Sequence, residues 1–223
     1  MACRMVVILG LLTLLGCSGR TSEKNDPGAE GSPGTVELVQ HDSTLIFDGK
    51  ALSGWEITNF GPQGPVSISA GEIILGMGDG CTGITYSGSI PALNYELTLE
   101  ARRKEGNDFF CGLTFPVGNN FCTFIAGGWG GTTVGLSCIN GKDASENETT
   151  SNMNFEKGRW YSIRLVVTEN KIETWIDEEK VVDFNTAGKK ISIRPEVTLS
   201  KPMGIASWNT TAGLRNIRII RQL

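Results

Sequence analysis

The residues of this chain best suited to acid–base chemistry are carboxylates near position 100, in the stretch NYELTLEARRKEGNDFFCGLTF that begins at Asn94. Its first half alternates apolar and polar side chains, which in a β-strand lie on opposite faces. Glu100 and Arg102 therefore share a polar face. A polar turn at 106–108 and a second apolar run follow, so we predict a hairpin that brings Asp108 beside that face. Two carboxylates in a groove can act as base and acid; the alternative is an ordinary solvated strand face.

A second feature with a chemical use is Trp129, which has glycines on both sides in the segment GGWGG. Glycine offers the indole ring no local cover, so the ring is either a platform on which a sugar stacks or a core side chain reached through a flexible bend. The segment is not a phosphate-binding loop, because it lacks the Lys-Ser/Thr ending and precedes a strand. Further carboxylates, Glu146 and Glu148, lie in the polar loop 143–150.

Histidine and cysteine chemistry is largely excluded. His41 is the sole histidine and has no serine-containing nucleophile elbow nearby, which argues against a histidine-based triad. No Cys-x-x-Cys pair exists, so a thiolate zinc site is not expected. If the strands flanking the Trp129 loop pair in antiparallel fashion, Cys122 falls opposite Cys138, and we predict that these two lie close enough to form a disulfide.

Short strands must position these residues. Alternation recurs at 160–168, and turn-forming glycines, asparagines and prolines separate some dozen apolar runs of strand length. No window longer than about ten residues shows helical spacing of apolar residues. We therefore predict an all-β domain over residues 44–223, built as a sandwich or jelly roll of two antiparallel sheets with few helices.

The N-terminus indicates export. Residues 1–17 combine one arginine, an apolar run and the sequence LLGC, which resembles a bacterial lipobox with Cys17 as the lipidated residue. The alternative is an ordinary cleaved signal. Residues 18–43 are rich in Gly, Ser, Pro and charge and are expected to form a flexible linker. The location would be the bacterial cell envelope, facing the periplasm or the exterior, with membrane contact only through the lipid.

The net charge of the chain limits the kinds of molecule that it is expected to bind. The formal net charge is −4, and a mildly acidic chain has no electrostatic basis for binding nucleic acid. A divalent cation bound by oxygens of Asp143, Glu146 and Glu148 is one further hypothesis, although these residues show no recognisable ligand spacing. No other cofactor is indicated.

The segment LIFDGKALSGW at 45–55 resembles the opening signature of the 3-keto-disaccharide hydrolase domain family. The strand and turn at 94–108, the segment 158–182, and the closing GIASW (204–208) and LRNI (214–217) are similar to later parts of that family's sequences. The resemblance covers residues 44–221. It implies a concanavalin A-like jelly roll that hydrolyses 3-keto-glycosides by elimination and hydration.

The chemistry that the resemblance implies needs a base and a group that stabilises the enolate oxygen, and strand face and charge suggest which residues supply them. Glu100 or Asp108 would be the catalytic base, and Arg102 would stabilise the oxyanion. Trp129, Glu146 and Trp208 would contact the carbohydrate. Two alternatives remain open because fold does not fix function: a non-catalytic carbohydrate-binding module that uses the same tryptophans, and a surface scaffold for protein partners.

Overall fold

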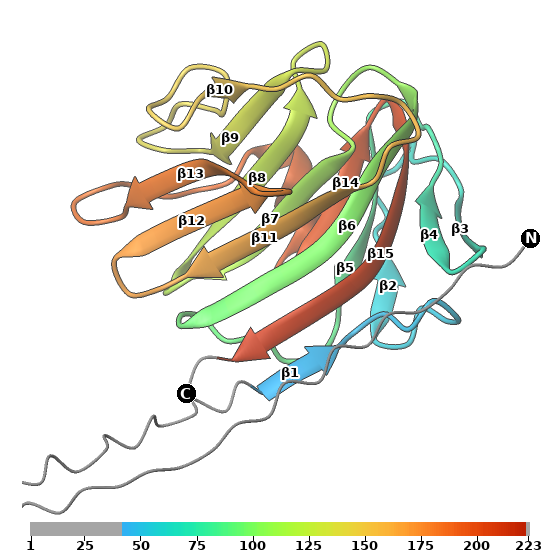
Figure 1. Ribbon diagram of the computed structural model, residues 1–223, viewed down its shortest axis with the longest axis horizontal. Coiled ribbons are helices and arrows are strands. Elements are labelled where there is room, and N and C mark those ends of the chain that lie inside the picture. The colour runs from blue at the N-terminus through green and yellow to red at the C-terminus, as the bar shows by residue number, and fades with distance from the viewer. Residues whose placement is uncertain (1–41, 222–223) are drawn as a thin grey trace, which may run out of the picture. The chain divides into compact units, whose positions relative to one another are not determined.

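Two antiparallel β-sheets packed face to face make up the part of the chain that the computed structural model describes, residues 42–221 (Figure 1). The predicted all-β sandwich is confirmed, and the strands match the concanavalin A-like jelly roll that the resemblance implied. The predicted signal peptide, Cys17, most of the linker and His41 lie outside the described residues. No helix in residues 42–221 is both long and apolar enough to cross a membrane.

The eight-stranded sheet has a seven-strand path, and its eighth strand, β1 (Asp42–Leu45), pairs with β15. In spatial order the path is β13 (Glu179–Asn185), β12 (Lys171–Ile176), β11 (Tyr161–Val167), β6 (Tyr95–Gly106), β15 (Thr210–Arg221), β4 (Glu72–Leu75) and β3 (Val66–Ser69). The seven-stranded sheet runs β10 (Ser151–Asn152), β9 (Thr133–Ser137), β8 (Asn120–Gly128), β7 (Cys111–Val117), β14 (Gly204–Trp208), β5 (Cys81–Tyr86) and β2 (Trp55–Ile57).

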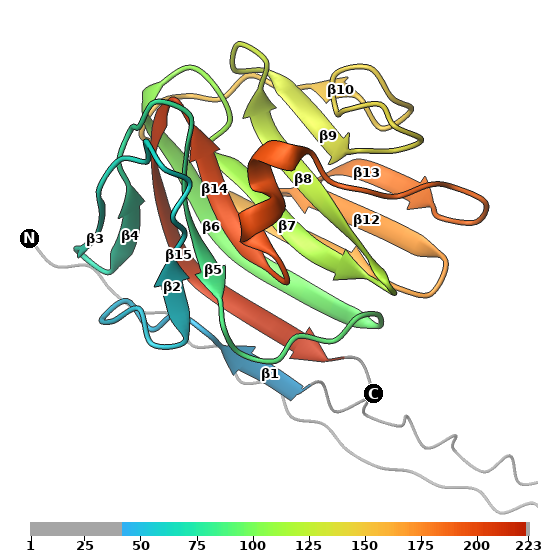
Figure 2. The same cartoon turned by 180° about the vertical axis from the view of Figure 1, so that it is seen from behind.

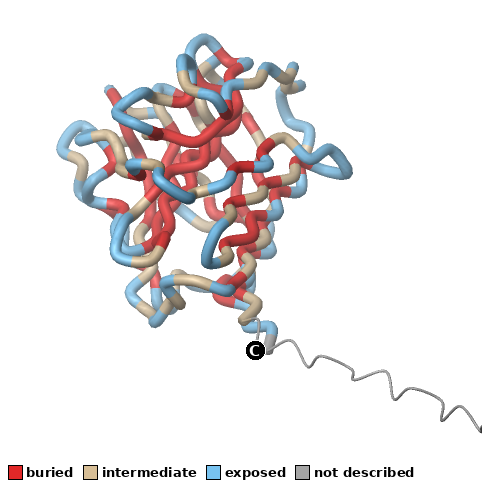
Figure 3. Tube along the Cα trace, turned by 90° about the vertical axis from the view of Figure 1, so that its left-hand side faces the viewer, coloured by how far each residue is buried: buried red, intermediate tan, exposed pale blue. Residues whose placement is uncertain are grey.

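The core lies between the two sheets, as the buried segments of Figure 3 show. Strand β6 illustrates why these residues form strands. Its apolar series Tyr95, Leu97, Leu99 and Ala101 is at most 2% exposed, whereas the residues between them are half-buried on the outer face. Phe115 and Phe124 from the opposite sheet complete the same core. The alternation seen in the sequence therefore reflects one buried and one solvated face.

The predicted hairpin between β6 and β7 is wrong. Strand β6 pairs with β11 on one side and β15 on the other, so neither of its edges is available to β7. Strand β7 instead pairs with β8 and β14 in the other sheet. Residues 107–110 thus cross from one sheet to the other, and the Asp108 N–H donates to Thr210 Oγ1 at this crossing.

The predicted disulfide between Cys122 and Cys138 is not formed, because all four cysteines in the described residues carry free thiols. The expected pairing of Ala126 with Val134 is present, but the ladder of β8 and β9 stops at Thr123 and Ser137. Beyond that point the backbone of Cys138 exchanges hydrogen bonds with Ser192. Cys138 therefore lies just beyond the end of the ladder that pairs β9 with β8.

A short 3-10 helix, η1 (Pro195–Ser200), is the one helix among residues 42–221, in line with the prediction of few helices. It lies across the outer face of the seven-stranded sheet, beside β5 and β14 (Figure 2). The turns at 139–150 cover β9 on the same side, since Asn147 Nδ2 donates to the carbonyl oxygens of Leu136 and Asp143. These two segments leave a hollow on the sheet between them.

Candidate functional site

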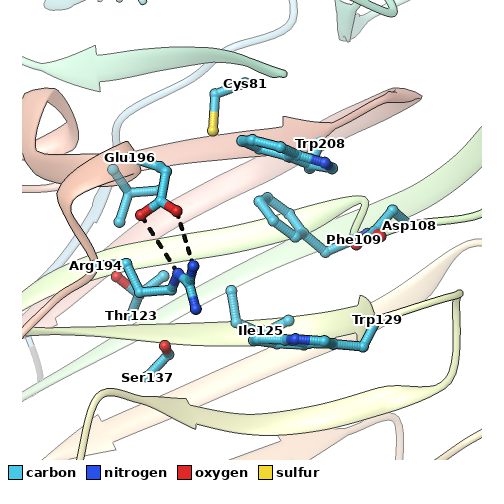
Figure 4. A pocket seen from close by; sticks show the side chains of 11 residues that line it. Cys81, Asp108, Phe109, Thr123, Ile125, Trp129, Ser137, Arg194, Glu196 and Trp208 are labelled. Carbon is cyan, nitrogen blue, oxygen red and sulfur yellow. Dashed lines mark hydrogen bonds and ion pairs between the residues drawn. The ribbon is translucent and has the colours of Figure 1, made fainter. Parts of the chain in front are cut away.

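A pocket of about 260 Å³ lies on the outer face of the seven-stranded sheet (Figure 4). Its volume is just below the roughly 300 Å³ at which small-molecule sites usually begin. The pocket exists because the outward positions of the central strands carry small side chains. Thr123 and Ser137 line it directly, and at Gly112 a Cβ atom would lie 2.9 Å from the Phe109 ring. Larger residues at these positions would fill the hollow.

Aromatic rings form two sides of the pocket. Trp208, at the end of β14, and Phe109, in the crossing before β7, have ring centroids 6.5 Å apart and lie on one side (Figure 4). Trp129 lies beside Ile125 on the other side, and 41% of it is exposed. Trp129 is therefore not a core residue, which removes that interpretation of the GGWGG segment, and the sugar platform stays a prediction. Sugars present apolar C–H faces that suit such rings.

The polar side of the pocket is built around Arg194. Its Nη2 donates to Glu196 Oε1 at 2.8 Å, and its Nη1 donates to Asp143 Oδ2 at 2.8 Å. Hydrogen bonding from Arg194 holds the pKa of Glu196 below its ordinary value, so Glu196 is ionised at neutral pH. The hydrogen bond to Glu196 likewise raises the pKa of Arg194. Arg194 is the single cationic side chain among the described residues that line the pocket.

Asp108 is the second carboxylate of the pocket, and it comes from the crossing between the sheets. Its Oδ1 accepts the N–H of Phe109 at 2.7 Å. Within residues 42–221 no hydrogen bond engages Oδ2 and no cation forms an ion pair with this carboxylate. Asp108 therefore makes fewer interactions within the protein than Glu196, and its Oδ2 is open to a proton from a bound ligand.

The structure separates the three residues predicted as catalytic. Asp108 lines the pocket, but Glu100 and Arg102 lie on the outer face of the eight-stranded sheet, on the opposite side of the sandwich. Arg215 Nε donates to Glu100 at 2.7 Å, and this hydrogen bond lowers the pKa of Glu100. Arg102 donates two hydrogen bonds to Glu72.

That outer face is a network of paired charges and stacked rings. Trp160 packs against two guanidinium groups, with the Arg102 and Arg215 Cζ atoms 4.4 and 4.1 Å from its ring centroid. Trp175 packs in the same way beneath Arg164. The arrangement matches a solvated strand face, which was the alternative interpretation of these residues.

The predicted carbohydrate-contacting residues divide similarly. Trp129 and Trp208 line the pocket, whereas Glu146 is exposed in the turns at 139–150 and does not. Asp143 is held by Arg194, and Glu148 forms an ion pair with Lys189. No group of three or more His, Cys, Asp or Glu side chains in the described residues is arranged to hold a metal ion. The cation hypothesis for this loop finds no support in that geometry.

Several pocket residues were missed by the sequence reasoning. Arg194 and Glu196 flank Pro195 in an irregular segment, and no periodicity relates them to β8 or β9. Cys81 also lines the pocket, but burial raises the pKa of its thiol to about 12, so it is protonated and not a nucleophile. Arg103 does not line the pocket, but its burial could have been predicted, because it continues the inward series of β6 and is only 5% exposed.

Comparisons with known proteins agree with this architecture. The comparison with curated proteins finds no match. Among solved structures, the Crh5 transglycosylase in complex with NAG is 13% identical with a TM-score of 0.56, covering 81% of this chain and 83% of that one. The endo-β-1,3(4)-glucanase SCLam of family GH16 is 9% identical with a TM-score of 0.53, covering 82% and 92%. These likenesses establish the fold.

A third solved structure, described under endo-acting O-glycanases of the human gut microbiota, is 12% identical with a TM-score of 0.55 and covers 81% of this chain and all of that one. The family comparison is more specific than any of these structures, since residues 42–220 match the family described as the 3-keto-alpha-glucoside-1,2-lyase-like domain. The match includes the opening signature and nearly every described strand. The chain is therefore a member of the 3-keto-alpha-glucoside-1,2-lyase-like domain family, on a fold used by carbohydrate-active proteins.

Proposed function

We propose that the protein cleaves 3-keto-glycosides by elimination followed by hydration, and that the pocket on the seven-stranded sheet is its active site. The observation that carries the proposal is the meeting of an uncommitted carboxylate, a guanidinium and two tryptophan rings in one pocket. Family membership supports the substrate class. Neither Glu100 nor Arg102 lines this pocket.

The chemistry needs few groups. A ketone at C3 of the sugar acidifies the C2 proton, so a base can remove it and form an enolate. Collapse of the enolate restores the ketone, forms the C1–C2 double bond and expels the glycosidic oxygen, which takes up the proton that the base removed from C2. Water then adds across the double bond, its oxygen to C1 and a proton to C2. The bond is broken without a covalent enzyme intermediate, so no closely spaced carboxylate pair of the usual glycosidase type is required.

We assign the roles from the contacts. Asp108 takes the C2 proton and passes it to the glycosidic oxygen, because within residues 42–221 no ion pair holds its carboxylate and no hydrogen bond engages Oδ2. Arg194 stabilises the enolate oxygen, as the single cation of the pocket lining. Glu196 is ionised and hydrogen-bonded to Arg194, so it orients the guanidinium rather than donating a proton. Trp129 and Trp208 hold the sugar rings.

The charge of the pocket favours an uncharged sugar. Arg194 already donates to Asp143 and Glu196, and Asp108 adds a further negative charge. A substrate carboxylate or phosphate would meet these acids without finding an unpaired cation in the lining. Discrimination against such groups follows from like-charge repulsion in a partly desolvated site.

We further propose that the protein acts at the bacterial cell envelope, anchored through a lipid on Cys17, on the basis of the sequence at residues 1–17. Radiolabelled palmitate incorporated into the wild-type protein but not into the Cys17→Ser variant would support this location. Equal labelling of both would contradict it.

The test of function compares a 3-keto-glucoside with its parent glucoside, following release of the aglycone. The full-length protein should release it from the 3-keto form, and Asp108→Asn should lose at least a hundredfold in kcat. Glu100→Gln is the matched control, since it neutralises a carboxylate on the opposite sheet. Loss with Glu100→Gln instead would place the reaction on β6. Tight binding without release in wild type would favour a binding module.

A further inference from the structure

Arg103 is a buried arginine at the end of the sandwich, and the roles proposed above do not use it. It follows Ala101 in the inward-facing series of β6 and is 5% exposed. A charged side chain in this position must be compensated, because a charge removed from water without partners is costly. No carboxylate in residues 42–221 forms an ion pair with it: burial lowers the pKa of Arg103, and the charge of Asp108 offsets this only in part. Its partners therefore indicate why it is there.

Those partners belong to the turn that carries Trp129. Arg103 Nη2 donates to the carbonyl oxygen of Gly127 at 3.0 Å and to that of Gly131 at 2.9 Å. The guanidinium thus forms hydrogen bonds with both ends of the turn between β8 and β9, and its Cζ lies 5.3 Å from the centroid of the Phe110 ring. Since β6 belongs to the eight-stranded sheet and the turn to the other, Arg103 ties the two sheets together at this point.

The turn needs glycines where the Arg103 guanidinium approaches its backbone. A Cβ on Gly127 would collide with Arg103 Nη2, and one on Gly131 would lie 2.8 Å from the Asn107 carbonyl oxygen and 3.3 Å from Arg103 Nη1. Gly127 and Gly131 also have φ of +78° and +108°, which other residues rarely adopt. The glycines of the GGWGG segment therefore make room for the Arg103 guanidinium and also allow the chain to turn.

The turn needs such support. Trp129 itself has φ of +46°, a left-handed conformation that costs a non-glycine residue energy. Inside the turn, a single backbone hydrogen bond, from the Gly131 N–H to the Gly128 carbonyl oxygen, is present. The two bonds from Arg103 hold the ends between which the strained residue sits.

We infer that Arg103 is a positioning residue: it fixes the turn at 127–131 and so places the Trp129 ring at the pocket before the sugar arrives. The inference rests on the proposed function for its consequence, since a fixed platform matters where a sugar stacks. Preorganisation of this kind improves affinity by removing the cost of ordering a loop on binding.

One arm of the test needs no substrate. The protein is labelled with 5-fluorotryptophan at its five tryptophans, and the Trp129 resonance is assigned through Trp129→Phe. Arg103→Met should shift or broaden that resonance and leave the other four unchanged. Arg102→Met is the matched control for the Trp129 resonance: it removes the neighbouring arginine, which pairs with Glu72 and packs on Trp160 at the outer face, so it should move the Trp160 resonance and leave that of Trp129 unchanged. An unchanged Trp129 signal in folded Arg103→Met would overturn the inference.

The second arm measures KM on the 3-keto-glucoside. Arg103→Met and Trp129→Ala should each raise KM about tenfold, and the double variant should rise no more than about threefold beyond either single change. Multiplying effects, near a hundredfold, would mean that Arg103 acts independently of Trp129. If Arg103→Met does not fold, Arg103→Lys replaces it in both the fluorine spectra and the KM measurement. If the wild-type protein shows no turnover, the proposed function is wrong, but the fluorine spectra still test whether Arg103 positions Trp129.

Discussion

Replacing Arg194 with methionine should remove most of the turnover. The guanidinium donates at 2.8 Å to Asp143 and at 2.8 Å to Glu196, and it is the single cation among the described pocket-lining residues. Without it the enolate loses its cationic partner and faces two unneutralised carboxylates. Removing one oxyanion donor typically costs about 3–4 kcal/mol, which corresponds to roughly a 10²–10³-fold loss in kcat.

The effect on stability should be far smaller. The Arg194 side chain is 41% exposed, so solvent screens its ion pairs, which contribute about 1 kcal/mol or less each. The assay is therefore steady-state release of aglycone from a 3-keto-glucoside, with thermal unfolding measured in parallel. A hundredfold loss of kcat with a nearly unchanged unfolding temperature is the expected result.

Two further variants sharpen the interpretation. Arg194→Lys keeps the charge but loses the planar fork that engages two carboxylates, so an intermediate loss of about tenfold is expected. Arg159→Met is the matched control, because Arg159 is also an exposed arginine with a 2.8 Å ion pair, to Asp177, but does not line the pocket. A kcat for Arg194→Met within threefold of wild type would refute the assigned role of Arg194.

Three other outcomes are expected. Hydrogen bonding from Arg215 lowers the pKa of Glu100 in the folded protein, so the stabilisation from this carboxylate is complete above its ordinary pKa of 4.5 and is lost as the pH falls through the folded pKa. The free energy of unfolding of Glu100→Gln should therefore lie below that of wild type by about 1 kcal/mol or less at pH 7, and the two should converge in acid. Native Cys81 should resist alkylation by iodoacetamide at pH 8, since burial raises its pKa to about 12, and modification as fast as in unfolded protein would contradict this. A 3-keto-glucuronide should show a kcat/KM at least tenfold below that of the 3-keto-glucoside, and equal values would disprove the charge argument for the pocket.

Alternation in the sequence determined much of the strand structure. The inward series from Tyr95 to Ala101 is buried as the pattern predicts, and the expected pairing of Ala126 with Val134 is present. These features depend on neighbours along the chain or on one short loop, so local reasoning reaches them. The same alternation, continued one step, places Arg103 inside the core.

Only the tertiary structure decided which sheet each strand joins. The turn at 106–108 looks like a hairpin, but β11 and β15 occupy both edges of β6, and those partners are 60 or more residues away in sequence. The consequence is functional, because Asp108 passes to the other sheet while Glu100 stays behind. Long-range pairing also brings Arg194 beside Asp143, across 51 residues. The sequence by itself therefore determined most of the strands and the family, whereas the position of the pocket followed from contacts that no local pattern encodes.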